Sequence, residues 1–281
     1  MPVFDTPEPI SVTLDIHVGD VQITAEDRTD TVVEVRPTDE SDASDVKAAE
    51  QTSVEYADGV LVIKAAKPTV PAMNFSRKSR SVDVSITLPA GSHVRGEAAL
   101  GDLRGSGRLG DCTFKTSTAH VRLDHVGSLR LDTAGHITVR RVDGDTEVKT
   151  STGRIRIGEI GGAVKAKNSN GHTEIGRVTG DVHVRAANGD ITVEHASGLE
   201  TDAKTSNGSI RVGEVTRGTV VLKTACGDLE VGIGADRPAK LDLSTGYGRV
   251  HNTLKPTDKS SEESVEVRAQ SSYGDITIHR A

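Results

Sequence analysis

Five basic residues recur at nearly equal spacing in the second half of the chain and could together bind a polyanion. They lie 18 or 19 positions apart, at Lys149, Lys167, Arg185, Lys204 and Lys223. If successive units of the chain stack on one another, these side chains form an uninterrupted basic column. Acidic residues nearby, such as Glu147 and Asp202, and the absence of interleaved aromatic residues favour a solvated face over a nucleic-acid site. We therefore expect no nucleic-acid partner.

A glycine pattern at residues 105–110 has the form of the dinucleotide-binding fingerprint. Gly105, Gly107 and Gly110 match G-x-G-x-x-G, which holds a pyrophosphate only where it opens a helix between two strands. The residues that follow, 111–116, have the pattern of a strand. We therefore predict a repeat turn here and no bound cofactor.

Acidic residues and histidines beside glycines raise the question of metal binding. In calcium-binding β-rolls, a nine-residue glycine repeat places acidic ligands in every turn. Asp145, Asp181 and Asp190 directly follow a glycine here, but Arg154 takes the same place in another unit. A cation at a ligand position argues against a calcium array. The ten histidines supply no complete zinc ligand set, so we predict no metal site.

The sequence contains no set of residues that converges on a catalytic site. Solenoid lyases and hydrolases need clustered carboxylates or a basic proton acceptor in a cleft. No series of equivalent positions stacks acidic residues in that way. Tyr247 and Tyr273 are the only aromatic residues in the C-terminal half, so rings that could stack on sugars are nearly missing. We predict no catalytic residues and favour a protein that is not an enzyme.

The element that must position all these residues is an internal repeat. Glycines recur every nine residues from Gly135 to Gly198, and the pattern continues at Gly208 and Gly227 with one residue inserted each time. Within each unit apolar residues alternate at period two, which predicts short strands rather than helices. Two such strands and their turns close one coil, and coils stack about 4.8 Å apart. The predicted fold is an all-β, single-chain parallel β-solenoid with 18–19 residues per coil.

Equivalent positions of successive coils become neighbours in such a fold. Asn170, Asn188 and Asn207 each precede a glycine, where asparagine tolerates positive φ and where their amides can bond one another. Two outward series alternate in sign, at Arg141, Glu159, Arg177 and His195 and at Glu147, Lys165, His183 and Asp202. Opposite charges on adjacent strands support the predicted stacking.

The N-terminal segment, residues 1–90, is acidic and less regular. It has strand-like runs at 11–24, 31–36, 59–65 and 82–88, a short helix predicted within 39–51, and a loop predicted at 67–81. We expect it to cap the solenoid of residues 91–281 and to be continuous with it, because an open end exposes unpaired strand edges. The C-terminal coil has no such cap, so we predict a self-association edge at Ile276 and Ile278.

Composition narrows the class of protein further. Hydrophobic residues make up 35% of the chain and charged residues 27%, which excludes a transmembrane segment and argues against global disorder. The net charge of −7 is uneven: residues 1–50 hold 13 acidic and 3 basic residues, a net of −10, which leaves 28 acidic and 31 basic residues elsewhere. The acidity belongs to one end, so the molecule as a whole does not mimic a polyanion.

The predicted location is the cytoplasm. The N-terminal residues lack the basic start and apolar run of a secretion signal. Cys112 and Cys226 are 114 positions apart, which resembles neither a disulfide framework nor a metal motif.

Two sets of residues carry a resemblance to a known family. The run from Val82 to Gly91 leads into repeats such as residues 205–210 and 225–231. This pattern resembles the bacterial β-strand-repeat proteins labelled adhesins, a family of undefined function, and is similar to the actinobacterial branch without a signal peptide. The resemblance covers most of the chain. It implies a right-handed β-solenoid and supplies no catalytic, metal or cofactor residues.

Three functions remain as hypotheses. The first is a non-enzymatic cytoplasmic scaffold or interaction protein, a homo-oligomer through its C-terminal coil. The second is a solenoid that binds, or acts on, a carbohydrate or another small molecule. The third, suggested by the family resemblance, is an adhesin-like or envelope-stress protein.

Overall fold

The structure is a computed structural model that describes residues 1–65, 80–235, 237–254 and 264–281. Its contacts divide the chain into two units, residues 1–134 and 135–281, and each unit is described by itself. The loop predicted at 67–81 lies outside the described residues except for its last two positions.

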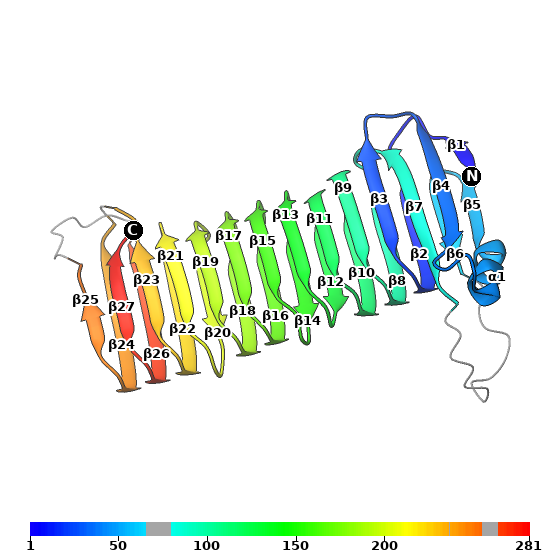
Figure 1. Cartoon of the computed structure of the whole chain (residues 1–281). Coiled ribbons are helices and arrows are strands. Elements are labelled where there is room, and N and C mark those ends of the chain that lie inside the picture. Colours follow the sequence, from blue (N-terminus) through cyan, green and yellow to red (C-terminus); the bar gives the residue numbers. More distant parts are fainter. Residues whose placement is uncertain (66–79, 236, 255–263) are drawn as a thin grey trace. The chain divides into compact units, whose positions relative to one another are not determined.

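Unit 2, residues 135–281, consists of parallel strands in two sheets, with two strands in each coil (Figure 1). We call them sheet A and sheet B. Sheet A contains, in spatial order, β13 (Ile137–Val142), β15 (Ile155–Ile160), β17 (Thr173–Val178), β19 (Ile191–Ala196), β21 (Ile210–Val215), β23 (Leu229–Ile233), β27 (Ile276–Arg280) and β25 (Val250–Asn252). Sheet B contains β14 (Thr146–Thr150), β16 (Val164–Asn170), β18 (Val182–Asn188), β20 (Glu200–Lys204), β22 (Gly218–Cys226), β26 (Val265–Tyr273) and β24 (Ala239–Tyr247).

The strand register confirms the predicted coil length. Ile137 lies beside Ile155, 18 residues on, and this step repeats through β17 to Ile191. The next two steps, from Ile191 to Ile210 and from Ile210 to Leu229, are 19 residues long. Alternate side chains of each strand point inward and are buried, and nearly all of them are Ile, Val, Leu, Ala or Thr. This aliphatic core explains how the solenoid forms with almost no aromatic residues.

Turn glycines allow successive coils to approach closely. Gly171, Gly189 and Gly208 have φ of 139°, 130° and 142°. A Cβ atom on Gly189 would lie 2.2 Å from the carbonyl oxygen of Gly171 in the preceding coil. The preceding asparagines do not take positive φ, because Asp58 is the only residue other than glycine that does so in the described part of the chain. The close contact between the backbones of adjacent coils leaves no space for a side chain at the glycine positions. The residue that adopts positive φ is therefore glycine.

The last strands of the chain do not form the outermost coil of unit 2. Strand β27 pairs with β23 on one side and with β25 on the other, so Ile276 lies between Leu229 and Val250. Ile276 and Ile278 are fully buried. The prediction of an exposed edge at these two residues is therefore wrong. The outermost coil consists of β24 and β25, which precede β26 and β27 in the sequence.

Unit 1, residues 1–134, also contains two sheets. The first has the order β1 (Val3–Asp5), β4 (Asp30–Pro37), β7 (Val82–Pro89), β3 (Val21–Glu26), β9 (Leu103–Arg108) and β11 (Val121–Val126). The second has the order β12 (Leu129–Thr133), β10 (Cys112–Thr118), β8 (His93–Leu100), β2 (Ser11–Val18), β6 (Val60–Lys64) and β5 (Ser53–Ala57). Strands β2 and β3 pair in parallel with β8 and β9, so the N-terminal segment contributes a coil of its own.

Antiparallel strands and a helix complete unit 1. Strand β4 pairs antiparallel with β7 and β1, and β5 pairs antiparallel with β6. The predicted helix is confirmed as α1 (Ala43–Gln51), which contacts β4 and β7. The Asp42 side chain caps it by accepting a hydrogen bond from the Ser44 N–H. In the strand order of the two sheets, β1 and β4 lie beyond the parallel strands at one edge, and β5 does so in the other sheet.

The two cysteines differ sharply in environment, and we expect them to differ in reactivity. Both are free, but Cys112 is buried and Cys226 is exposed. Burial raises the pKa of the Cys112 thiol to about 12, which suppresses the reactive thiolate. A thiol-reactive dye should therefore modify one cysteine in the native protein and two after unfolding. With Cys226→Ser, native labelling should vanish. Rapid labelling of that variant would contradict the buried position of Cys112.

Candidate functional site

The five basic residues predicted to form a column do lie in register on the outer face of sheet B. Lys149 is beside Lys167, Lys167 beside Arg185, and the pairing continues through β20 to β22. We call Lys149, Lys167, Arg185, Lys204 and Lys223 the basic column. Four intervals of about 4.8 Å give it a length of roughly 19 Å.

Acidic neighbours compensate only part of this charge. Lys149 Nζ lies 3.0 Å from Glu147 Oε1. Arg185 and Lys204 both bind the carboxylate of Asp202. Within the described part of the chain, the exposed side chains of Lys167 and Lys223 make no ion pair or hydrogen bond. Like charges on adjacent strands repel, so the column is an electrostatically costly feature of the sheet.

Asp202 lies at the centre of this arrangement. Its side chain is 12% exposed, and Lys204 Nζ lies 3.2 Å from each carboxylate oxygen. Burial alone would raise its pKa, but hydrogen bonds from Arg185 and Lys204, together with their charges, hold the pKa below its usual value. Asp202 is therefore ionised at neutral pH and acts as a built-in counter-ion for two members of the column.

One cluster with metal-ligand chemistry was not predicted from the sequence. Candidate ligand atoms of His183, Glu200 and Asp202 lie within 4.8 Å of one another. Strand register brings His183 beside Asp202, and Glu200 lies two residues earlier on the same face. In the sequence, the only indication of this cluster was that His183 and Asp202 occupy equivalent, outward-facing positions of successive coils. Arg185 and Lys204 already bind the Asp202 carboxylate, so a metal cation would have to compete with two positive charges.

The aspartates that follow the turn glycines have a structural role. Asp145 Oδ1 accepts a hydrogen bond from the Ala163 N–H of the next coil at 2.8 Å. Asp181 Oδ1 accepts one from the Leu199 N–H, and Asp190 Oδ1 accepts one from the Ser209 N–H. His172 takes the same role, because its Nδ1 accepts from the Asp190 N–H at 3.3 Å. A side chain that accepts a hydrogen bond from the next coil explains the aspartates and His172. Arg154, at the same position in another coil, cannot accept and instead lies 3.7 Å from Glu174 Oε1.

Asparagines and serines line the corner beside the basic column. Asn188 donates to Asn170 Oδ1 and Asn207 donates to Asn188 Oδ1, each at 2.9 Å, which confirms the predicted amide ladder. Between this ladder and the column lie three exposed serines, Ser151, Ser169 and Ser206. Serine side chains at these positions are short, so the flank of the basic column is sterically open.

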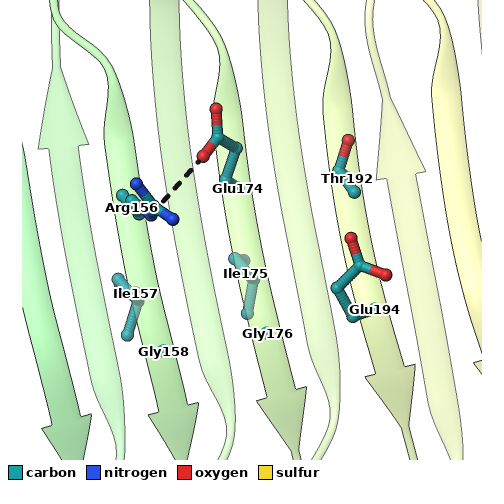
Figure 2. Close-up of a pocket in the computed structure, with 8 residues that line it drawn as sticks. All are labelled: Arg156, Ile157, Gly158, Glu174, Ile175, Gly176, Thr192 and Glu194. Carbon is teal, nitrogen blue, oxygen red and sulfur yellow. Dashed lines mark ion pairs between the residues drawn. The ribbon is translucent and has the colours of Figure 1, made fainter.

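A depression of about 390 Å³ lies on the outer face of sheet A (Figure 2). Gly158 and Gly176 lie on adjacent strands at its floor and contribute no side chains. Their backbones are close: a Cβ on Gly176 would lie 2.2 Å from Gly158 O. Arg156 and Glu174 form an ion pair across it at 3.7 Å, and Glu194 lines its other side. Among the described residues no histidine, serine, cysteine or lysine lines it, and its polar lining side chains are those of Arg156, Glu174, Thr192 and Glu194. The depression could hold a small molecule.

The glycine fingerprint at residues 105–110 has no helix after it. Gly105 and Gly107 lie in β9, and the chain passes through Gly110 directly into β10. The turn predicted for residues 105–110 is thus confined to the end of that segment, at Gly110, and most of the segment is strand.

The outer coil of unit 2 presents a free strand edge. Strand β24 has nine residues and pairs only with β26 among the described strands. Its inward-facing Leu241 and Leu243 are half-buried, whereas their neighbours Val267 and Ala269 in β26 are fully buried. Val250 in β25 and Tyr247 in β24 are 46% and 72% exposed. The core of the solenoid is thus incompletely covered at this coil.

Comparison with known proteins gives a family match and several structural similarities. The family model described as Toastrack DUF4097 matches residues 12–280. No curated protein matches the chain. A "putative cell adhesion protein" from Clostridium sporogenes is 12% identical, covering 100% of this chain and 98% of its own, with a TM-score of 0.23. A "putative adhesin" from Bacteroides fragilis is 13% identical, covering 99% and 95%, with a TM-score of 0.35. Another from Parabacteroides merdae is 12% identical, covering 100% and 95%, with a TM-score of 0.36.

Within the described ranges, no helix combines the length and apolar character needed to cross a bilayer.

Proposed function

Because this chain belongs to the Toastrack DUF4097 family, we propose that it works through the surfaces of its solenoid, as a non-enzymatic cytoplasmic scaffold that self-associates. The observation that carries the proposal is the free edge of β24. A nine-residue strand with one side unpaired among the described strands offers a row of backbone N–H and C=O groups to another strand. The half-buried Leu241 and Leu243 add apolar surface that a second copy would cover.

The charges of β24 favour a two-fold pairing of identical edges. If two β24 strands pair antiparallel about Leu243, that residue faces its own copy and Leu241 faces Thr245. Lys240 then faces Gly246, and Asp242 faces Ser244. No like charges meet across the interface, and all nine residues can pair. Such an isologous contact closes after two copies, so the expected assembly is a dimer rather than a filament.

The stretch of sequence between β25 and β26, residues 255–263, contains only Lys, Pro, Thr, Asp, Ser and Glu. It therefore offers no apolar side chain for Leu241 and Leu243, and a second copy is the apolar partner that we propose for them.

The free thiols support the cytoplasmic part of the proposal. Cys226 is exposed and unpaired, and a reducing compartment keeps such a thiol reduced. Fractionation of the native host, followed by immunodetection, would test this location. Detection mainly outside the cytoplasm would contradict it.

Light scattering across a concentration series tests the self-association directly. We expect the mass to rise from 29.6 kDa toward twice that value. Leu243→Lys should weaken the dimer about a hundredfold or more, because two ammonium groups would face each other at its centre. A control for the added charge is Val221→Lys on the outward face of an inner strand, β22, which should leave the mass unchanged. A wild-type protein that stays monomeric at high concentration would overturn the proposal.

A further inference from the structure

The basic column is a straight line of positive charge that the protein itself only partly neutralises. Its five members occupy consecutive coils in strict register. Glu147 and Asp202 pair with three of them, which leaves Lys167 and Lys223 uncompensated among the described residues. Lys165, exposed and also without an ion pair there, adds a further charge beside Lys167. A bound polyanion would relieve this repulsion.

The groups on this surface that remain available act as hydrogen-bond donors. Lysine and arginine side chains donate and cannot accept. The hydroxyls of Ser151, Ser169 and Ser206 run beside the column and can also donate. The two carboxylates nearby already accept from column members. The surface therefore suits a ligand that presents negatively charged acceptors along its whole length. A chain of phosphates does so, whereas the hydroxyls of a neutral sugar chain accept but carry no charge.

The column lacks the features that other polyanions need for binding. No Phe, Tyr or Trp occurs in β14, β16, β18, β20 or β22, so single-stranded nucleic acid would find no ring on which to stack its bases. An acidic protein segment would need apolar anchors, whereas the column is flanked by Ser and Ala on its corner side and by mostly charged residues, with Val221 alone apolar, on the other. We propose that the basic column binds inorganic polyphosphate, a linear phosphate polymer without bases, laid along the roughly 19 Å that the five coils span.

Asp202 would compete with a polyphosphate bound to the basic column. Its carboxylate holds Arg185 and Lys204, so polyphosphate must compete with it for both side chains. Asp202→Asn removes one negative charge from the centre of the column and releases two cations. Polyphosphate should then bind more tightly, by about threefold or more. A merely structural role for Asp202 would produce the opposite effect, since its loss would disorder the column.

Fluorescence anisotropy with end-labelled inorganic polyphosphate tests the proposal on the full chain. The wild type should bind it, with an affinity that falls steeply as NaCl rises. Lys167→Glu with Lys223→Glu should weaken binding about tenfold or more. The matched control reverses two exposed arginines on sheet A, Arg156→Glu with Arg211→Glu, and should change the affinity by less than about twofold.

The outcomes separate a specific site from general charge attraction. Oligo-dT of equal charge should bind at least about tenfold more weakly than polyphosphate, and so should heparin. Equal binding of either polymer, an equal loss in the sheet A control, or weaker binding by Asp202→Asn with an unchanged melting temperature would overturn the proposal. The test does not depend on the β24 dimer, because Leu243→Lys should bind polyphosphate through the same column.

Discussion

Gly189→Ala should lower the free energy of unfolding by about 3 kcal/mol or more. Gly189 has a φ of 130°, a conformation that side chains rarely adopt. The new Cβ would also lie 2.2 Å from the Gly171 oxygen and 2.6 Å from its carbonyl carbon. These are rigid backbone atoms, so two coils would have to separate. Urea denaturation followed by circular dichroism measures the loss.

Gly234→Ala is the matched control for this substitution. Gly234 lies in the same unit, has no positive φ, and its nearest contacts would be 3.4 Å from an added Cβ. We expect the control to change stability by less than about 0.5 kcal/mol. Equal effects of the two substitutions would show that successive coils do not approach as closely as the structure describes.

Asn168→Leu should cost about 3 kcal/mol, because two carbonyl groups lose their side-chain donor. Asn168 is 3% exposed and points into the core. Its Nδ2 donates to Gly153 O at 2.8 Å and to Gly171 O at 2.9 Å. Leucine has a similar volume but no donor. The loss should be visible in thermal and urea denaturation alike.

Asn168→Thr provides the informative comparison. Threonine occupies the equivalent position in other coils, where Thr150 donates to Gly135 O at 2.9 Å and Thr224 donates to Gly208 O at 2.9 Å. A threonine at 168 can keep the bond to Gly153 and should recover about half of the loss. If Asn168→Thr were as unstable as Asn168→Leu, volume rather than hydrogen bonding would determine stability at this position.

Much of unit 2 could be predicted because its repeat translates sequence spacing directly into spatial neighbours. Eighteen residues of separation place Lys149 beside Lys167, and Asn170 beside Asn188. The same arithmetic predicted the alternating charges, and Arg141 does pair with Glu159 at 3.2 Å. Period-two alternation of apolar residues was sufficient to predict which side chains are buried.

The order of the last coils could not be predicted by that arithmetic. A repeat argument assumes that each coil stacks on the coil before it in the sequence. Strand β22 instead pairs with β26, and the intervening β24 lies beyond it. In β24 the charged residues Lys240 and Asp242 alternate with apolar residues. This pattern is compatible with an outer strand and with an inner strand. It therefore could not predict that β24 lies beyond β26.

The candidate surfaces were predictable to different degrees. The basic column could be predicted from the spacing of its residues alone. The role of Asp202 as a shared counter-ion depends on side-chain burial, and the depression above Gly158 and Gly176 depends on what neighbouring strands leave uncovered. The free edge was assigned to Ile276 and Ile278, which are in fact internal, because chain order does not determine spatial order in this coil stack.

Disulfide trapping at Leu243 tests the proposed self-association most directly. In a Cys226→Ser background, Leu243→Cys should give a disulfide-linked dimer under mild oxidation, because the two thiols would face each other across the two-fold axis. Leu241→Cys alone should cross-link slowly, since its partner in this register is Thr245, whereas a mixture of Leu241→Cys and Thr245→Cys chains should cross-link readily. Failure of Leu243→Cys to cross-link while its thiol remains reactive, or equal cross-linking at positions 241 and 243, would contradict the two-fold β24 interface.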